Sequence, residues 1–385
     1  MTSNFGFVGF DGTENKRTIF AADAANKYTG NDGDLNVLLR NPHPTARATL
    51  AYMQRDCQNV VPYISDEGTR QKWEGHGVKV AGNYQDFLRA SDALMIGTPS
   101  HQEPLYVRDG LNEGCFIALM GGADREEILK DLEEKKFNVG CGLKEDLTGE
   151  FFFGMQNYGE FLERDPQLVQ CTSCNTTGLS RLAYAARPLG LTNMAGNIDR
   201  RIADPPGSAK GYINSVEFGD KPGHQGEDAG TVFKDVDFKI RASKIPTTVP
   251  HVNDLMLVFE GEVTPKELVD ALAGTSGVVV MPYKSEGKKY SATGNILENV
   301  QIGLRRPWSP NVYEALVSEA IIPVNLGDKT MLQTKSMTEQ MSIAVPNHVE
   351  ALLLNMRYPE SEVRRTIDES LGLLHGVWPD KLSAY

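Results

Sequence analysis

The first 170 residues alternate short apolar runs of strand type with segments of helical spacing. Strands that alternate with helices pair in parallel, and the helices then cover the faces of the sheet. A helical pattern over residues 16–28 joins the first two apolar runs into a strand–helix–strand unit. This half of the chain therefore predicts an α/β fold with a Rossmann-type dinucleotide-binding sheet. The expected strands span residues 5–10, 34–40, 60–64, 78–81, 93–97, 116–120 and 168–171.

After Cys174 the pattern changes to longer strand candidates with wide spacing. Such a segment is typical of an α+β domain with a mainly antiparallel sheet. Two further helical patterns, over residues 349–358 and 360–374, are expected to pack back onto the first domain. We therefore expect a dinucleotide-binding domain over 1–173, completed by C-terminal helices within 349–385, and a catalytic domain over 174–348. In the second domain the expected strands are 196–202, 236–245, 255–260, 277–283 and 301–304, the helices 177–186 and 264–273, and the loops 203–211 and 217–230.

Composition excludes several classes of protein. The 385 residues carry a formal net charge of −12, and an acidic surface repels nucleic acid. The longest apolar runs reach six residues, whereas a membrane-spanning helix needs about 20. The five cysteines form neither a disulfide framework nor paired motifs of zinc type. These features predict a cytoplasmic protein that acts on small molecules and has no metal site.

The segment from Cys171 to Gly178, CTSCNTTG, carries the strongest chemical signal. It follows a strand candidate and opens a helix, so Cys174 is expected at a helix N-terminus, where the dipole and free N–H groups stabilise a thiolate. The same N–H groups, with Asn175, could bind the oxyanion that forms when a thiolate adds to a carbonyl. The alternative is a buried structural cysteine followed by a Ser/Thr helix cap. A redox role for the pair is less favoured, and Cys171 is expected in the core.

These residues resemble a known family. Ser173 to Leu179, followed by Arg181, is similar to the nucleophile motif of archaeal-type glyceraldehyde-3-phosphate dehydrogenases. Four further blocks follow in the order of that family, and together they cover nearly the whole chain. The first, residues 199–205 (DRRIADP), resembles the family's Arg-Arg-Ala-Ala-Asp-Pro segment, and the second, residues 222–228 (PGHQGED), resembles its Pro-Ser-His-His-Gly-Pro-Asp loop. The third, residues 246–251 (PTTVPH), resembles its Pro-Thr-Thr-x-Met-His strand. In the fourth, Gln340 and Pro346 line up with its Gln-Glu-Ser-Asp-Val-Ile-Pro block.

The resemblance implies oxidation of D-glyceraldehyde 3-phosphate with NAD(P)⁺ and inorganic phosphate, in a homotetramer. Cys174 would form a thiohemiacetal and then a thioester, and His251 would be the general base. Without the family, His251 would more readily be a structural histidine, and the pair Arg200–Arg201 a solvated ion-pair face. By resemblance, Arg200 contacts the cofactor or the anions, and Arg201 shares in binding the substrate. The other residues expected to bind the substrate are Ser173, Asn175, His224 and Gln225. Those expected to bind the cofactor are Gly121, Gly122 and Gln340.

The expected phosphate loop departs from the glycine pattern of a dinucleotide fold. Gly9 and Gly12 can form its turn, whereas Asn15 stands where a third glycine is expected, and the intervening candidates are Thr13 and Glu14. Asn tolerates a left-handed backbone, so the turn could survive. At the end of the second strand, Arg40 replaces the acidic residue that would bind a ribose hydroxyl. Arg40 therefore favours NADP over NAD, unless it is simply a surface residue.

Three further departures affect the catalytic half. Gln225 and Asn253 replace family histidines, and residues 341–343 lack the acidic part of the family block. Residues 138–159 look longer than their family counterpart and carry three exposed-looking phenylalanines, Phe151 to Phe153. Two alternatives therefore stay open beside the glyceraldehyde-3-phosphate enzyme: a related thioester-forming dehydrogenase for another phosphorylated or acidic aldehyde, and a non-catalytic paralogue that acts as a binding or assembly protein.

Overall fold

The computed structural model describes residues 2–99, 101–202, 215–219, 223–247, 250–282, 284–285, 288–289, 292–304, 311–378 and 381–384. The expected loop over 203–211 lies outside these residues. The chain divides into two compact units. The first comprises Met1–Cys171 and Val345–Leu371, and the second comprises Thr172–Ala344 and Gly372–Tyr385.

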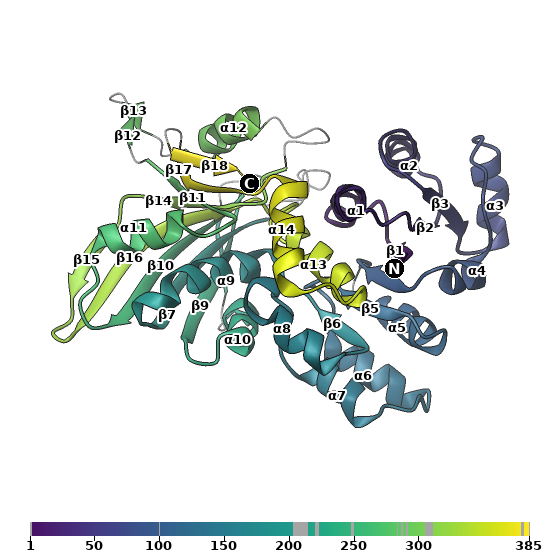
Figure 1. Cartoon of the computed structure of the whole chain (residues 1–385), viewed down its shortest axis with the longest axis horizontal. Coiled ribbons are helices and arrows are strands. Elements are labelled where there is room, and N and C mark those ends of the chain that lie inside the picture. Colours follow the sequence, from purple (N-terminus) through teal and green to yellow (C-terminus); the bar gives the residue numbers. More distant parts are fainter. Residues whose placement is uncertain are drawn as a thin grey trace. The chain divides into compact units, whose positions relative to one another are not determined.

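The first unit contains a six-stranded parallel sheet (Figure 1). Its strand order, β3-β2-β1-β4-β5-β6, is that of the Rossmann fold, so the predicted fold class is confirmed. The expected strand over 78–81 does not form. The chain after it pairs with β3 through an isolated bridge between Tyr63 and Gly82, and Asn83 then caps the N-terminus of α4. The strands are β1 (Phe5–Val8), β2 (Leu35–Leu39), β3 (Val60–Ile64), β4 (Ala93–Ile96), β5 (Phe116–Leu119) and β6 (Leu168–Gln170).

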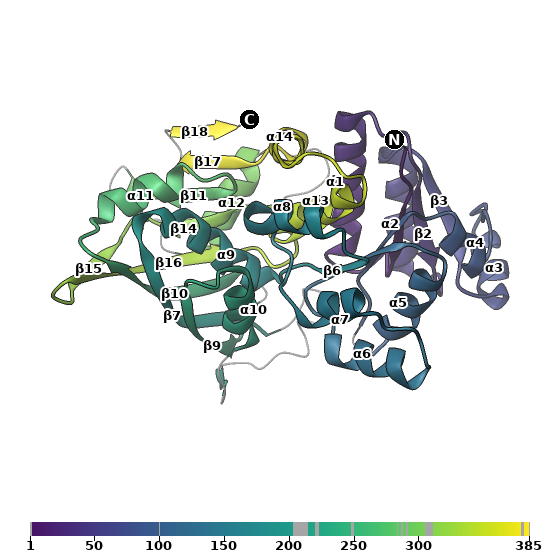
Figure 2. The same ribbon diagram turned by 60° about the horizontal axis from the view of Figure 1, so that its bottom comes forward.

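Helices cover both faces of this sheet (Figure 2). One face packs its aliphatic side chains against α4, α5, α6 and α7, in a core that includes Val8, Leu94 and Ile117. On the other face α1 packs against α13, and α13 also contacts β4, β5 and α8. The helices are α1 (Asn15–Thr29), α2 (Pro44–Asp56), α3 (Glu67–Glu74), α4 (Tyr84–Arg89), α5 (Glu103–Asn112), α6 (Arg125–Glu134), α7 (Cys141–Thr148), α8 (Gly154–Arg164), α13 (Val345–Asn355) and α14 (Glu360–Leu371).

The three consecutive phenylalanines are buried, contrary to the sequence expectation. Phe151, Phe152 and Phe153 are 6%, 0% and 1% exposed. The backbone N–H of Phe152 donates to the Gln170 carbonyl at 2.7 Å, which attaches the segment to the edge of the sheet beside β6. The ring of Phe152 then meets Phe161 edge-on, with 5.3 Å between centroids. The segment over 138–159 therefore extends the core of the first unit.

The second unit contains a ten-stranded mixed sheet with most neighbours antiparallel, as predicted. Parallel pairing occurs between β7 and β9 and along β17, β11 and β14. The strands are β7 (Leu191–Arg201), β8 (Glu217–Phe218), β9 (Asp237–Ile245), β10 (His251–Glu260), β11 (Val278–Met281), β14 (Ala315–Ser318), β15 (Ile322–Asn325), β16 (Lys329–Thr338), β17 (Leu374–Val377) and β18 (Lys381–Ala384), with β12 (Lys284–Ser285) and β13 (Lys288–Lys289) as a separate ribbon. The helices are α9 (Cys174–Ala186), α10 (His224–Val232), α11 (Pro265–Ala273) and α12 (Thr293–Leu304), with a 3₁₀ turn η1 (Arg187–Leu189).

Three expectations about this half are wrong. Residues 301–304 end helix α12, because Ile296 and Val300 face the core at helical spacing. The second half of the expected loop over 217–230, from His224 on, is part of α10, which approaches β9 closely at Gly226, where a Cβ would lie 3.2 Å from Ile240. Residues 374–377 and 381–384 form β17 and β18 within the second unit instead of helices of the first, because Gly372 leaves α14 with φ +59° and the Leu374 backbone N–H donates to Glu314 at 2.9 Å.

Candidate active site

Cys174 is the first residue of helix α9. Ser173 caps this helix in an extended conformation, and its hydroxyl accepts the Thr176 backbone N–H at 3.5 Å. The helix begins three residues before the expected 177–186 pattern, since the cap lies at Ser173. The helix dipole and the first free amides therefore act on the Cys174 sulfur and favour a thiolate.

His251, the first residue of β10, brings its imidazole to this sulfur. Its Nε2 lies 3.7 Å from Cys174 Sγ, and the Asn175 amide nitrogen lies 3.9 Å from the same atom. The side chain of His251 is almost fully buried. Its Nδ1 accepts the Arg201 backbone N–H at 3.1 Å. Two nitrogen groups thus converge on one sulfur at a helix N-terminus.

The electrostatic surroundings keep His251 neutral. Burial lowers the pKa of His251 to about 3, and the charges of Arg201 and Arg200 add to this effect. A hydrogen bond with Gln340 acts in the opposite direction and is the smallest of these influences. The imidazole is therefore uncharged across the physiological range.

The other four cysteines lie in different environments. Burial raises the pKa of the Cys57 and Cys171 thiols far above the ordinary value, and that of Cys115 to about 11. Cys171 lies in the core of the first unit, as expected, with its sulfur 3.9 Å from the Asn347 carbonyl. All five cysteines are free thiols, and Cys141 is the exposed one. Cys141 also begins a helix, α7, and so offers a matched reference for Cys174.

The arginine pair lies at the end of β7. Arg201 is 6% exposed, and its Nε donates to the side-chain oxygen of Gln340. Arg200 is half-buried, and its Nε has no hydrogen-bond partner among the described residues. Gln340 therefore lies beside Arg201 and His251 in the second unit.

Helix α10 adds a second polar cluster. His224 Nδ1 lies 2.9 Å from a carboxylate oxygen of Asp228, and His224 Nε2 lies 2.8 Å from the Gln225 amide nitrogen. Asp228 also accepts the Thr176 hydroxyl of α9 at 3.5 Å. Sequence reasoning missed Asp228. Its spacing of four residues from His224 would have identified it if this segment had been predicted as a helix.

The substitution of Asn253 for a family histidine has a structural counterpart. Asn253 is fully buried, and its amide nitrogen donates to the Ser336 hydroxyl at 3.1 Å. It therefore ties β10 to β16 two residues after His251.

Gly178 sets the distance between α9 and the strands beneath it. A Cβ at this position would lie 2.5 Å from Thr338 Cγ2, and Thr338 is the cross-strand partner of His251. We expect Gly178→Ala to lower the free energy of unfolding by about 1–3 kcal/mol and to reduce turnover, because the added methyl group pushes α9 away from the His251 strand pair. Chemical denaturation of the second unit measures the first effect.

Thr338→Ser provides the matched control, because it removes the methyl group that Gly178→Ala meets. The double variant Gly178→Ala/Thr338→Ser should recover most of the lost stability. A double variant as unstable as Gly178→Ala alone would contradict the close-packing explanation.

In the first unit, the predicted glycine loop lies at the carboxyl end of β1, between the two halves of the sheet. Gly9 has φ +78°, and a Cβ there would lie 2.4 Å from the Gly97 carbonyl oxygen. The Gly12 N–H donates back to the Gly9 carbonyl at 2.9 Å and closes the turn. Dinucleotides bind at this point of a Rossmann sheet, where the backbone must be approached closely. The bare backbone of the turn fits such a ligand.

Asn15 does not take the left-handed conformation that was considered for it. It is the first residue of α1, and its buried amide nitrogen donates to the Val8 carbonyl at 2.8 Å. Its Oδ1 is buried without a hydrogen-bond partner among the described residues. Asn15 therefore ties α1 to β1 where a glycine would allow close packing. Glu14 precedes it as the helix cap, and the Thr13 carbonyl accepts the Arg17 guanidinium at 2.6 Å.

The loop after β2 carries Arg40, which is exposed. Its guanidinium donates to the Tyr106 hydroxyl at 2.6 Å. A carboxylate oxygen of Asp11, in the glycine loop, lies 2.7 Å from His43 Nε2. Gly121 and Gly122 form a turn directly after β5, as expected.

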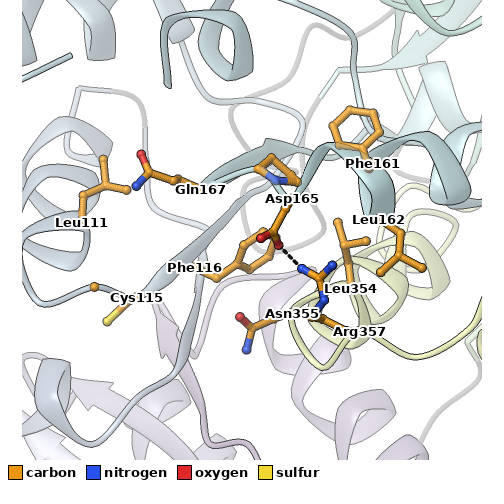
Figure 3. A pocket seen from close by; sticks show the side chains of 12 residues that line it. Leu111, Cys115, Phe116, Phe161, Leu162, Asp165, Gln167, Leu354, Asn355 and Arg357 are labelled. Atoms are coloured by element: carbon orange, nitrogen blue, oxygen red, sulfur yellow. Dashed lines mark hydrogen bonds and ion pairs between the residues drawn. The ribbon is translucent and has the colours of Figure 1, made fainter. Parts of the chain in front are cut away.

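A separate cavity of about 240 Å³ lies in the first unit (Figure 3). Phe116, Phe161 and Leu354 line it, and Asp165 and Arg357 form an ion pair across it. It lies beside the amino ends of β5 and β6, and none of the predicted site residues lines it.

Among the described residues, no cluster of three or more His, Cys, Asp or Glu side chains could hold a metal ion. Within the same part of the chain, no helix is both long and apolar enough to cross a membrane.

Comparison with known proteins gives several glyceraldehyde-3-phosphate dehydrogenases as relatives. No protein-family model matches the chain. A glyceraldehyde-3-phosphate dehydrogenase from Metallosphaera sedula is 30% identical over 293 residues, which cover 75% of this chain and 77% of the relative. The enzyme of the same name from Archaeoglobus fulgidus is 26% identical, covering 81% of this chain and 84% of that protein. That from Thermococcus kodakarensis is 27% identical, covering 84% and 88%.

Among solved structures, aspartate semialdehyde dehydrogenase II from Vibrio cholerae matches 93% of this chain and 99% of its own, with a TM-score of 0.57 and 8% identity. At this identity the match shows the shared fold. The sequence relatives indicate a dehydrogenase of the glyceraldehyde-3-phosphate type. The chain belongs to the family of archaeal glyceraldehyde-3-phosphate dehydrogenases.

Proposed function

We propose that this protein is a phosphorylating glyceraldehyde-3-phosphate dehydrogenase, which oxidises D-glyceraldehyde 3-phosphate with NAD(P)⁺ and inorganic phosphate through a thioester on Cys174. The observation that carries the proposal is the placement of Cys174 at the start of α9, with His251 Nε2 3.7 Å from its sulfur. A thiolate there attacks the aldehyde carbon, and the resulting oxyanion lies near the Asn175 amide and the helix N-terminus.

The anionic groups of the substrates need cationic partners. Arg200, whose Nε has no partner among the described residues, and Arg201 supply guanidinium groups beside the nucleophile. Ser173, Asn175, His224 and Gln225 complete the proposed substrate site. When bound, a nicotinamide dinucleotide supplies the acceptor for the hydride that leaves the substrate carbon. Gly9, Gly12, Thr13, Glu14 and Asn15, with Arg40, Gly121, Gly122 and Gln340, are its proposed contacts.

A cofactor-reduction assay tests the function. Glyceraldehyde 3-phosphate should be oxidised fastest in a panel of aldehydes that includes aspartate semialdehyde, and turnover should require phosphate. Faster oxidation of another aldehyde would favour the related dehydrogenase. No oxidation of any aldehyde would favour the non-catalytic paralogue, which the paired Cys174 and His251 argue against. The homotetramer and the cytoplasmic location are part of the proposal, and sedimentation of the purified protein checks the first.

The choice of cofactor follows from Arg40. We propose a preference for NADP, because an exposed guanidinium at the end of β2 can bind the 2′-phosphate. Arg40→Ala should remove most of that preference, a change of about ten- to a hundredfold. Calorimetric titration of NADP and NAD into both proteins measures it.

Tyr106→Phe is the matched control for Arg40, since it removes the hydroxyl that holds the guanidinium and keeps the charge. It should weaken NADP binding less than Arg40→Ala does. Equal affinity of the unmodified protein for the two cofactors would contradict the assignment.

A further inference from the structure

The cavity of about 240 Å³ in the first unit lies at the amino edge of the parallel sheet (Figure 3). Phe116 is the first residue of β5, and Gln167 directly precedes β6. Dinucleotides bind at the carboxyl ends of the strands of such a sheet. The cavity is therefore separate from the proposed cofactor contacts. Its apolar lining consists of Leu111, Phe116, Phe161, Leu162 and Leu354.

The solvent side of the cavity carries one acidic and one basic side chain. Asp165 and Arg357 are 73% and 55% exposed, and they form an ion pair with each other. Figure 3 shows this pair beside the ring of Phe116. An exposed ion pair contributes little to stability, because water screens both charges. Separating the two side chains therefore costs little free energy.

Both charged residues hold a left-handed backbone. Asp165 ends α8 with φ +51°, and Arg357 follows α13 with φ +57°. A residue with a Cβ adopts this conformation less readily than glycine does. The two turns by themselves therefore do not call for charged side chains. Strained backbone of this kind is typical of ligand clamps.

Helices α5, α8 and α13 all end at the cavity. Leu111 lies in the last turn of α5, Leu162 in that of α8 and Leu354 in that of α13. The carboxyl end of a helix carries partial negative charge. These helix ends and Asp165 favour a cationic group, and Arg357 supplies the positive charge that a carboxylate needs.

We propose that this cavity binds a free α-amino acid whose side chain is apolar and of leucine size or larger. The carboxylate of the ligand accepts from the Arg357 guanidinium, and its ammonium donates to the Asp165 carboxylate. The ligand separates the ion pair and gives each of the two residues a new charge-assisted hydrogen bond. Its side chain packs against Phe116 and Phe161, where burial of apolar surface adds to affinity.

The two charged groups of the ligand are needed together. A monoamine would pair with Asp165 and leave Arg357 without its counter-ion. A monocarboxylate would pair with Arg357, but it would lie near Asp165 and the negative helix ends. The zwitterion satisfies both residues at once. Its binding does not depend on the proposed enzymatic activity, because no residue of the candidate active site lines the cavity.

Calorimetric titration of leucine, methionine and phenylalanine into the full chain, without aldehyde or cofactor, tests the proposal. The controls are 4-methylpentanoate and 3-methylbutylamine, which keep the side chain of leucine and lack its ammonium or its carboxylate. Leucine should bind about ten- to a hundredfold more tightly than either control. No saturable binding of any of the three amino acids at millimolar concentration, or a control that binds as tightly as leucine, would overturn the proposal.

Two charge variants test the contacts one at a time. Asp165→Asn removes the charge and keeps a residue that tolerates the left-handed backbone. It should weaken leucine binding about ten- to a hundredfold and should not weaken binding of 4-methylpentanoate. Arg357→Gln should weaken leucine binding in the same way and should spare 3-methylbutylamine. Equal losses for leucine and for the control that lacks the partnered group would overturn the assignment.

A third variant tests the position of the side chain. Leu162 is half-buried in the lining, so that Leu162→Trp should fill the cavity and abolish leucine binding. Thermal unfolding of each variant checks the fold. Unchanged leucine binding in a folded Leu162→Trp protein would overturn the location. The exposed Asp165 and Arg357 variants decide the question if the tryptophan variant unfolds.

Discussion

Replacement of Cys174 by serine is expected to abolish aldehyde oxidation, with turnover reduced by at least ~10⁴-fold. A serine hydroxyl is far less acidic than a thiol, so the helix N-terminus and the neighbouring His251 and Asn175 side chains cannot ionise it. Thermal stability should change little, because oxygen replaces sulfur at a position that is only partly buried. Cofactor binding should persist, since the glycine loop is formed within the other unit. Steady-state assays, thermal unfolding and calorimetry measure the three quantities.

Cys141→Ser is the control for this prediction. Cys141 begins a helix as Cys174 does, and it is exposed. Its replacement should leave turnover unchanged. If Cys174→Ser retains turnover, the nucleophile must be sought elsewhere in the chain.

Two buried histidines should make the protein sensitive to acid. The pKa values of His251 and His348 are lowered to about 3, in both cases chiefly by burial. In the unfolded state each histidine binds a proton below its pKa of about 6.5, whereas in the folded state it stays neutral until the pH approaches 3. The free energy of unfolding is therefore unaffected by these groups above pH 6.5 and decreases as the pH falls from 6.5 toward 3. Each histidine should therefore lower the free energy of unfolding of its own unit by about 2 kcal/mol between pH 6.5 and pH 5.

Denaturant unfolding of wild type and His348→Gln across this range measures the effect. His348 lies in α13 of the first unit, with its Nδ1 3.0 Å from the Thr18 hydroxyl. The glutamine variant cannot titrate, so its first unit should show a shallower pH slope even if it is less stable overall. Parallel slopes for the two proteins would contradict the assignment.

The parallel sheet of the first unit was predictable because each strand is buried on both faces and reads as an apolar run. The segment over 78–81 was wrongly predicted as a strand, since it runs along the edge of the sheet without becoming part of it. The burial of Phe151 to Phe153 was not predictable, because the pairing of Phe152 with Gln170 joins residues that only the fold brings together. The same applies to β17, because Gly277 and Glu314, which hydrogen-bond Leu374, are distant in sequence.

In the candidate site, the position of Cys174 followed from a local helix-start pattern. His251 came from family resemblance, because 77 residues separate it from Cys174 and no local pattern connects them. The hydrogen bond from the Arg201 backbone N–H to His251 Nδ1 joins two neighbouring strands, and only their pairing reveals it. Asp228 and the Asn253–Ser336 contact were missed for the same reason.

The central claim is that Cys174 carries the acyl group. Incubation with NADP or NAD and glyceraldehyde 3-phosphate, without inorganic phosphate, followed by acid quenching and peptide mass spectrometry, tests it most directly. We predict one acyl group per chain, bound to the Cys174 peptide, lost when phosphate is added and absent in Cys174→Ser. Cofactor reduction without an adduct on Cys174, or with the adduct on another cysteine, would contradict the account.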